Sequence, residues 1–264
     1  MSTAVKNLRI YGNEPFNIAV IHGGPGAPGE MAPVARRLSS VRGVLEPLQT
    51  ATSLRGQIQE LNTVLKDNGD LPVILIGWSW GAMLSFIFAA QYPSFVVKLI
   101  LIGSGAYEEK YAINIMKTRL GRLSEDEREE ALSLMGILND SAIGDKNATM
   151  TQLGKLIAKA DSYDPLPYDS EVLECQYDIY QNVWGKAREL RSSGKLLELG
   201  KNIQCPVVAI HGDYDPHPSE GVEDPLSRII RDSRFILLEK CGHHPWLERA
   251  ARDKFYDILK SEVE

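Results

Sequence analysis

The stretch "GWSWG", residues 77–81, places a serine between two glycines in the pattern G-x-S-x-G. It directly follows the apolar run "PVILI" and opens the apolar run "AMLSFIFAAQY", which predict a buried strand and a buried helix. In that setting the pentapeptide is typical of a nucleophile elbow, a strained turn that leaves the serine hydroxyl exposed at the end of a sheet. We therefore predict that Ser79 is a catalytic nucleophile rather than a structural serine at a helix N-terminus.

A serine hydroxyl is a weak nucleophile and needs a general base. The five histidines of the chain all follow predicted strands, and strand ends in an open α/β sheet line one crevice. In "CGHHPWLE" we predict His243 as the base, because His244 precedes a proline that restricts it to extended conformations. In "HGDYDPHP" we predict Asp215 as the orienting acid in preference to Asp213, because it lies near the far end of the turn. The chain order Ser79, Asp215, His243 is the one expected of this arrangement.

The stretch "VIHGGPGAPGE", residues 20–30, places a flexible glycine-rich loop beside a histidine. One interpretation is that its backbone N–H groups face the oxyanion of an acyl-transfer reaction. A rival interpretation is the dinucleotide fingerprint G-x-G-x-x-G, with Glu46 as the ribose-binding acid about twenty residues further on. We favour the first, because Pro28 has no N–H to offer a pyrophosphate and the rival leaves the serine, acid and histidine unexplained.

The elements that must position these residues follow from the alternation of short apolar runs with helical patterns. Strands that are apolar throughout, with helices between them, predict a mostly parallel sheet covered on both faces. This alternation stops over residues 107–200, where the pattern is mostly helical and includes a capping box of Ser124 with Glu127. We predict a core of residues 1–106 and 201–264 with a helical cap, or lid, at 107–200. The predicted strands are 16–22, 43–50, 72–77, 96–103, 206–212 and 234–240, and the main predicted helices are 30–40, 53–69, 81–92, 170–194, 219–231 and 246–263.

Four motifs of the chain together resemble the proline iminopeptidase branch of the α/β-hydrolase superfamily. "HGGPG" and "GWSWG" form the characteristic pair, with tryptophan after the nucleophile, and "HGDYD" and "GHHPWLE" match that branch's acid and histidine loops. The resemblance covers about residues 1–105 and 203–264. It implies an α/β-hydrolase fold in which the backbone N–H groups of Gly24 and Trp80 form the oxyanion hole and His22 supports the loop by hydrogen bonds.

The resemblance implies a serine hydrolase that cleaves an ester or amide bond of a small substrate through an acyl-enzyme. An aminopeptidase of the proline iminopeptidase type is one form of it, and a carboxylesterase or a carbon–carbon bond hydrolase is the alternative. The insertion departs from the family, because it lacks the Trp- and Glu-rich segment that holds a substrate's free amine. Glu171, Glu174 and Asp178 offer carboxylates for an amine, although their spacing favours a solvated helix face. No cofactor is expected, and the expected partner is a small-molecule or short-peptide substrate.

Composition restricts the remaining classes of function. A formal net charge of −6 argues against nucleic acid or an anionic membrane as a partner. Residues 71–97 carry no charge, but their two glycines and two prolines fit a strand, a turn and a helix better than a membrane span. The N-terminus has no apolar signal-peptide region, and Cys175, Cys205 and Cys241 do not form a disulfide or zinc pattern. We therefore expect reduced thiols and a cytoplasmic location.

Two further interpretations compete with the serine hydrolase. Histidine and aspartate alternate over residues 211–217, and with the pair 243–244 they offer ligands for a metallohydrolase. However, no compact ligand motif such as H-E-x-x-H is present, and no metal is expected. The second interpretation is a non-catalytic protein that binds a small molecule on a hydrolase scaffold, since fold does not determine function. The complete set of serine, acid and histidine argues against it.

Overall fold

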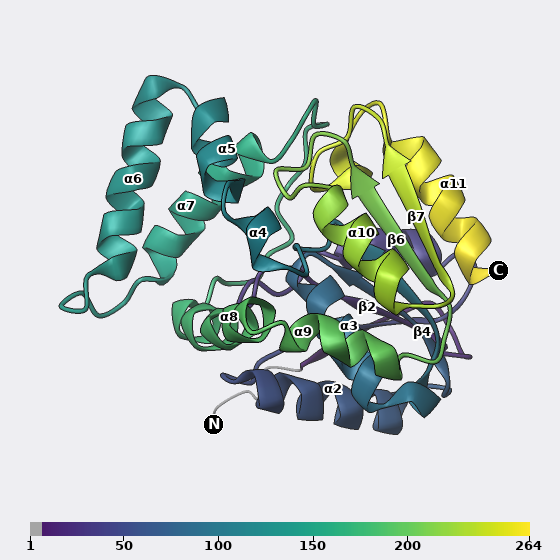
Figure 1. Ribbon diagram of the computed structural model, residues 1–264. Coiled ribbons are helices and arrows are strands. Elements are labelled where there is room, and N and C mark those ends of the chain that lie inside the picture. The colour runs from purple at the N-terminus through teal and green to yellow at the C-terminus, as the bar shows by residue number, and fades with distance from the viewer. Residues whose placement is uncertain (1–6) are drawn as a thin grey trace.

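A single mostly parallel sheet organises the protein, with helices packed on both of its faces (Figure 1). The computed structural model describes residues 7–264. Seven strands lie in the order β1-β3-β2-β4-β5-β6-β7, and every neighbouring pair is parallel except β1 with β3. The fold class predicted from the sequence is therefore confirmed. The strands are β1 (Leu8–Tyr11), β2 (Ile18–Ile21), β3 (Val44–Pro47), β4 (Val73–Trp78), β5 (Val96–Ile102), β6 (Val207–Gly212) and β7 (Ser233–Leu238).

Two apolar clusters, one on each face of the sheet, form the core. Successive side chains of a strand point to opposite faces. In β5, Leu99 and Leu101 join the cluster under α2, α3, α8, α9 and α10, whereas Ile100 and Ile102 join the cluster under α1 and α11. The helices are α1 (Ala32–Leu38), α2 (Leu54–Asn68), α3 (Trp80–Gln91), α4 (Glu109–Ala112), α5 (Ile115–Arg122), α6 (Glu125–Asn139), α7 (Asn147–Ala160), α8 (Tyr177–Ser192), α9 (Lys195–Glu198), α10 (Glu220–Ile229) and α11 (Arg252–Val263), with 3₁₀ turns η1 (Pro93–Phe95), η2 (Leu199–Asn202) and η3 (Pro245–Leu247).

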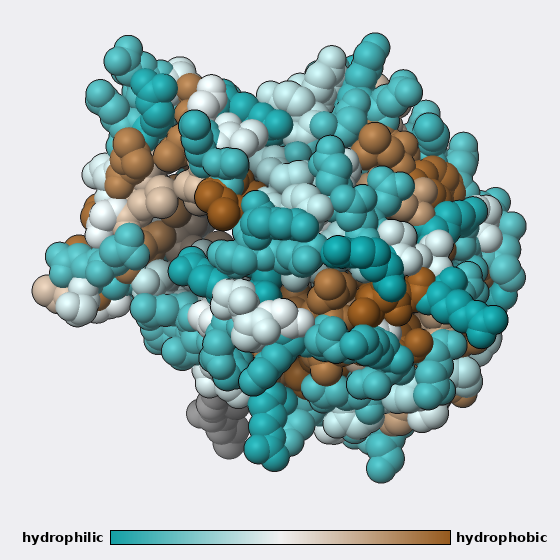
Figure 2. Space-filling view, in the orientation of Figure 1, coloured by the Kyte–Doolittle hydropathy of each residue, from teal (hydrophilic) through white to brown (hydrophobic). Residues whose placement is uncertain are grey.

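The region between β5 and β6, where the cap was predicted, divides into two parts. Helices α5, α6 and α7 form an arm that stands away from the sheet (Figure 1), and the predicted capping box of Ser124 and Glu127 begins α6. Helices α8 and α9 instead pack onto the core through buried residues such as Val183 and Leu196. The space-filling view is mostly hydrophilic on this face but shows a hollow with apolar atoms where the arm leaves the body (Figure 2). The exact division of core and cap at 106 and 201 stays a prediction, and residues 1–6 lie outside the described part.

Two predicted helices are shorter than their patterns indicated. The helix predicted over 170–194 begins only at Tyr177, because residues 171–176 form neither helix nor strand and the backbone of this segment binds the glycine-rich loop. Leu173 N–H donates to the carbonyl of Pro28 (3.0 Å), and Gln176 N–H donates to that of Gly26 (2.7 Å). The closing helix predicted over 246–263 begins only at Arg252, after the short turn η3. None of the helices between residues 7 and 264 combines the length and apolar character needed to cross a bilayer.

Glu46 carries a buried carboxyl group in β3, beside the edge strand β1. The Tyr11 hydroxyl donates to its Oε2 (2.6 Å), and Arg9 Nη1 lies 3.5 Å from the same oxygen. Burial raises the pKa of Glu46 to about 7, and the hydrogen bond from Tyr11 and the charge of Arg9 only partly oppose this. Glu46 therefore anchors the edge of the sheet and is not presented to a ribose, as the dinucleotide interpretation would require.

We predict that Glu46→Gln makes the free energy of unfolding less dependent on pH. In the folded protein the pKa of Glu46 lies above its ordinary value of 4.5. The contribution of Glu46 to the stability of the fold is therefore complete below pH 4.5 and is lost as the pH rises through about 7. Between acidic and mildly alkaline pH, the wild type should lose roughly 3 kcal/mol more stability than the variant. Urea unfolding at a series of pH values measures this difference. Parallel pH curves for the two proteins would contradict it.

Candidate active site

Ser79 sits at a sharp turn between β4 and α3. Its backbone is strained, with φ of 54° and ψ of −115°, a region that non-glycine residues rarely adopt. The flanking glycines explain how the turn fits: a Cβ at Gly77 would lie 2.2 Å from the carbonyl oxygen of Gly81, and a Cβ at Gly81 would lie 2.2 Å from that of Ile21. Only hydrogen at both positions lets the backbone segments approach this closely. The G-x-S-x-G pattern is thus a packing requirement of the turn.

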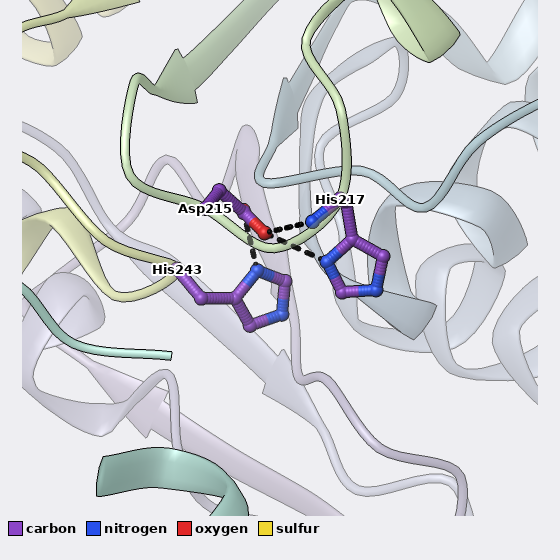
Figure 3. A group of neighbouring side chains, drawn as sticks. All are labelled: Asp215, His217 and His243. Atoms are coloured by element: carbon purple, nitrogen blue, oxygen red, sulfur yellow. Dashed lines mark hydrogen bonds and ion pairs between the residues drawn. The ribbon is translucent and has the colours of Figure 1, made fainter. Parts of the chain in front are cut away.

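The structure brings Ser79, His243 and Asp215 into one hydrogen-bonded chain. The Ser79 hydroxyl donates to His243 Nε2 (2.9 Å), and His243 Nδ1–H donates to Asp215 Oδ2 (2.6 Å), the second of which is drawn in Figure 3. The direction follows because a carboxylate only accepts, which places the imidazole proton on Nδ1 and leaves Nε2 free to accept. The three residues come from the loops after β4, β6 and β7, so parallel strand ends deliver them to one crevice.

The charges of this cluster are set by opposing effects. Burial would raise the pKa of Asp215, but the electrostatic influence of His243, His217 and His211 holds it well below its ordinary value. Burial would lower the pKa of His243, but the charge and hydrogen bond of Asp215 outweigh burial and raise it above its ordinary value. Asp215 is therefore ionised, and His243 is a stronger base than a free imidazole. This arrangement is able to accept the proton of the Ser79 hydroxyl.

Gly103, at the end of β5, lies directly beneath the histidine and the carboxylate. A Cβ at this position would come within 3.1 Å of His243 Nδ1 and 3.3 Å of Asp215 Oδ2. Its φ of +49° is also a conformation that side-chain-bearing residues rarely adopt. The pair therefore has room to form its short hydrogen bond because residue 103 has no side chain. The sequence analysis did not single out this glycine.

The glycine-rich loop lies beside Ser79 and presents the amides proposed for an oxyanion hole. Trp80 is the first residue of α3, and neither its N–H nor that of Gly24 has an acceptor within residues 7–264. His22 is buried, and its Nδ1–H donates to the carbonyl of Gly23 (2.7 Å). Burial lowers the pKa of His22 to about 4, so the ring is neutral. The roles of Gly24, Trp80 and His22 stay predictions.

His244 and Asp213, the alternatives to His243 and Asp215 in the sequence, make different contacts. The ring of His244 packs 4.5 Å from that of Trp78, and burial lowers the pKa of His244 to about 3. Asp213 Oδ1 accepts the backbone N–H of Cys241 (3.0 Å), which braces the turn. Within residues 7–264, neither side chain is hydrogen-bonded to Ser79.

The metal site and the dinucleotide-binding loop, the two other ligand sites considered from the sequence, can be compared with this geometry. Asp215, His217 and His243 each offer one possible metal-ligand atom within 4.8 Å of the others, but both oxygens of Asp215 already accept N–H groups from the two histidines. The glycine-rich loop is covered: a Cβ at Gly26 would lie 2.3 Å from the carbonyl oxygen of Gln176. Neither the metal centre nor the pyrophosphate-binding loop is favoured by these contacts.

Trp78 is a positioning residue that the sequence analysis missed. Its indole Nε1–H donates to the backbone carbonyl of His243 (2.8 Å), across 165 residues of chain. Its ring also packs against His243 and His244, and it fills the space beside Gly23, where a Cβ would lie 2.3 Å from a ring carbon. One side chain next to the nucleophile thus contacts both the histidine loop and the glycine-rich loop. Its position inside the pentapeptide was the only signal in the sequence.

One buried carboxylate and one backbone carbonyl connect the histidine loop to the predicted cap. Glu248 Oε1 accepts the N–H groups of Gly242 (2.9 Å) and Tyr163 (2.8 Å), and Oε2 accepts that of Asp164 (2.8 Å). The carbonyl oxygen of Asp161 accepts the backbone N–H of His243 (2.8 Å). The segment 161–164 is therefore joined directly to the loop that carries the histidine.

The side chain of Asp161 has a partner of its own in the arm. Arg119 of α5 donates to both of its carboxylate oxygens, Nε to Oδ1 (2.8 Å) and Nη2 to Oδ2 (2.7 Å). Such a bidentate pair combines energy with a fixed orientation. It orders the segment from which the Asp161 carbonyl reaches the histidine loop.

The sheet, the strained serine turn and the convergent loops define an α/β hydrolase. The sequence pattern of the alpha/beta hydrolase fold family matches residues 49–250, and the chain belongs to this family. It is 25% identical over 190 residues to "Serine hydrolase BPHL" of Mus musculus, and the matched region makes up 71% of this chain and 53% of that protein. It is 27% identical over 190 residues to a "Pimeloyl-[acyl-carrier protein] methyl ester esterase" of Nitrosospira multiformis, which covers 69% of this chain and 65% of that protein.

Both relatives are named as a hydrolase or an esterase, and the chain spans only about half to two thirds of their length. The crystal structure of a proline iminopeptidase from Mycobacterium smegmatis is similar with a TM-score of 0.62 and 16% identity, covering 97% of this chain and 93% of that one. At this identity the likeness shows the shared fold alone, so the assignment to the iminopeptidase branch stays a prediction.

We predict that Trp78→Phe destabilises the protein more than Trp246→Phe does. Both changes shrink a buried indole to a phenyl ring, but only Trp78 leaves a buried backbone carbonyl without its donor. An unsatisfied buried acceptor costs about 1–3 kcal/mol, and the difference between the two variants in urea unfolding should fall in that range. Equal losses in the two variants would show that the hydrogen bond to His243 contributes nothing.

Proposed function

We propose that this hydrolase cleaves a carboxylic ester of a small substrate through an acyl-enzyme formed on Ser79. The observation that carries the proposal is the continuous hydrogen-bonded chain from the Ser79 hydroxyl through His243 to Asp215. The esterase-type relatives support an ester as the bond that is cleaved.

In the proposed mechanism, Ser79 Oγ attacks the ester carbonyl carbon while His243 Nε2 takes the hydroxyl proton. The tetrahedral oxyanion accepts the N–H groups of Gly24 and Trp80, which have no acceptor in the described chain. His243 then gives its proton to the departing alkoxide, which leaves as an alcohol. Water repeats the cycle on the acyl-enzyme and releases the acid. Asp215 keeps the imidazole in the tautomer with the proton on Nδ1 and stabilises its charged form.

The surroundings favour an uncharged ester over a peptide with a free amine. Glu171 forms an ion pair with Arg36, and both Glu174 and Asp178 are exposed. These three carboxylates therefore provide no unpaired, sheltered charge for an ammonium group. Burial raises the pKa of Glu30, in the glycine-rich loop, to about 8, so it is largely uncharged at neutral pH.

Aminopeptidase activity is the second candidate, favoured by the resemblance of the four sequence motifs to the iminopeptidase branch. A panel of p-nitrophenyl esters of graded acyl length beside aminoacyl-naphthylamides separates the two candidates. Ester turnover with no amide turnover supports the esterase. Faster turnover of the naphthylamides would replace it with the aminopeptidase, and tight ligand binding without turnover of any substrate would favour the non-catalytic scaffold.

We predict that Ser79→Ala abolishes ester turnover, with a loss on the order of 10⁵–10⁶-fold in kcat. Ser85→Ala is the matched control, because Ser85 is a buried serine of α3, the helix that follows Ser79, and its hydroxyl has no partner in residues 7–264. A fluorophosphonate probe should label the wild type and the Ser85 variant but not the Ser79 variant. Normal turnover or labelling in the folded Ser79 variant would refute the role of this serine.

We predict that kcat/KM for a substrate without titratable groups falls as the pH is lowered. The base must be neutral to take a proton, and the acidic limb of kcat/KM reports its pKa in the free enzyme. Because Asp215 raises the pKa of His243, the midpoint of this limb should lie above the ordinary value of 6.5. Initial rates with a p-nitrophenyl ester, corrected for nitrophenol ionisation, measure the limb. A rate that stays constant well below pH 6 would contradict the assignment.

A further inference from the structure

The Asp215 carboxylate is shared between two histidines (Figure 3). Its Oδ2 accepts His243 Nδ1–H (2.6 Å), whereas its Oδ1 accepts both His217 Nδ1–H (2.7 Å) and the backbone N–H of His217 (2.9 Å). The mechanism proposed above uses only the first of these bonds. The other two leave a second imidazole bound to the opposite oxygen of the same carboxylate.

His217 is held firmly in this position. The residue is buried, and its ring lies 4.7 Å from that of His243, with 31° between the ring planes. His211 Nε2–H donates to the carbonyl oxygen of His217 (2.8 Å), which closes the loop around the carboxylate. The end of β6 therefore supplies the donor that secures His217, and the loop after β6 supplies the acid and its second histidine.

His217 acts on the carboxylate as a neutral donor. Burial lowers the pKa of His217 to about 4 despite the nearby charge of Asp215, so the ring carries one proton at neutral pH. Its hydrogen bond to a carboxylate places that proton on Nδ1. A neutral imidazole can occupy the second oxygen without placing a positive charge beside the imidazolium that forms on His243.

Other titratable groups also face this pair of histidines. They come from β6 and the loop after it, from the predicted cap, from the glycine-rich loop and from the histidine loop. They are Asp215, His211, Arg119, Asp161, Glu30 and His244. A change at His217 leaves all of them in place, so a comparison of variants at this one position isolates its donor.

We propose that His217 is a positioning residue of the active site, which fixes the rotation of the Asp215 carboxylate and leaves Oδ2 to His243. A carboxylate oxygen accepts two hydrogen bonds, and the side chain and backbone N–H of His217 occupy both sites of Oδ1. Without the side-chain donor, the buried negative charge is shared among fewer partners. It then attracts the proton of His243 more strongly, and the carboxylate is freer to rotate. This inference rests on the proposed function.

A purely structural role makes a different prediction. The backbone N–H of His217 closes a turn with the Asp215 side chain on its own, a common use of aspartate. If the ring only fills space there, any side chain of similar volume will serve. If the ring acts as a donor, only a side chain that offers N–H at the same place will serve.

The experiment compares His217→Asn with His217→Leu. Asparagine places an amide nitrogen at the same bond separation from Cα as histidine Nδ1, and leucine has a similar shape without a donor. We expect H217L to lower kcat for a p-nitrophenyl ester by about tenfold or more, with little change in KM. The acidic limb of kcat/KM should move to higher pH in H217L. H217N should recover most of the lost rate and return the limb towards its wild-type position.

NMR titration of the histidine ring protons gives a readout that does not need turnover. The pKa of His243 should rise in H217L and stay near the wild-type value in H217N. Equal pKa values in the wild type and H217L, or equal losses of rate in both variants, would overturn the role of His217. If H217L does not fold, as judged by thermal unfolding, H217A replaces it. Absence of ester turnover in the wild type would instead reject the proposed function, while the NMR comparison would still decide the role of His217.

Discussion

The proposed active site depends on one buried negative charge, the carboxylate of Asp215. Removing a carboxylate from water is costly unless hydrogen bonds and opposite charge replace the water. Here two N–H groups of His217 and one of His243 replace it, with His211 nearby. This compensation keeps the acid ionised inside the protein, and the ionised acid in turn gives the histidine beside Ser79 its orientation and basicity.

The sheet makes this arrangement possible by bringing parallel strand ends together at close quarters. β4 ends at the serine, β6 at the acid loop and β7 at the histidine loop, while β5 passes beneath them and ends at Gly103. The approach of these segments leaves no space for side chains at several backbone positions. Side chains that lie far apart along the chain are therefore brought together by tight backbone packing.

Much of the fold and of the proposed serine, acid and histidine cluster could be predicted from the sequence, because it depends on local sequence patterns. Apolar runs marked six of the strands, and the glycines around Ser79 together with the order of acid and histidine indicated which side chains would meet. What could not be predicted depended on partners remote in sequence. The extended segment before α8 has helical spacing, but hydrogen bonds to the carbonyls of Gly26 and Pro28 decide its conformation. The alternating residues 211–217 suggested metal ligands, whereas the fold wraps them around a carboxylate. Strand β1 is short, and its pairing with β3 gave no signal of its own.

Glu248 determines which part of the predicted cap can change without moving the histidine loop. Its carboxylate joins the histidine loop to the segment that follows α7, so that segment cannot shift without disturbing the loop that carries His243. Within residues 7–264 the hairpin of α6 and α7 makes no hydrogen bond to this carboxylate, and it packs around a small apolar cluster of Leu123, Ala131 and Ala160. Chimeras that exchange this hairpin between relatives, with both junctions placed before the carboxylate's contacts, would change the predicted cap while leaving the histidine loop held in place.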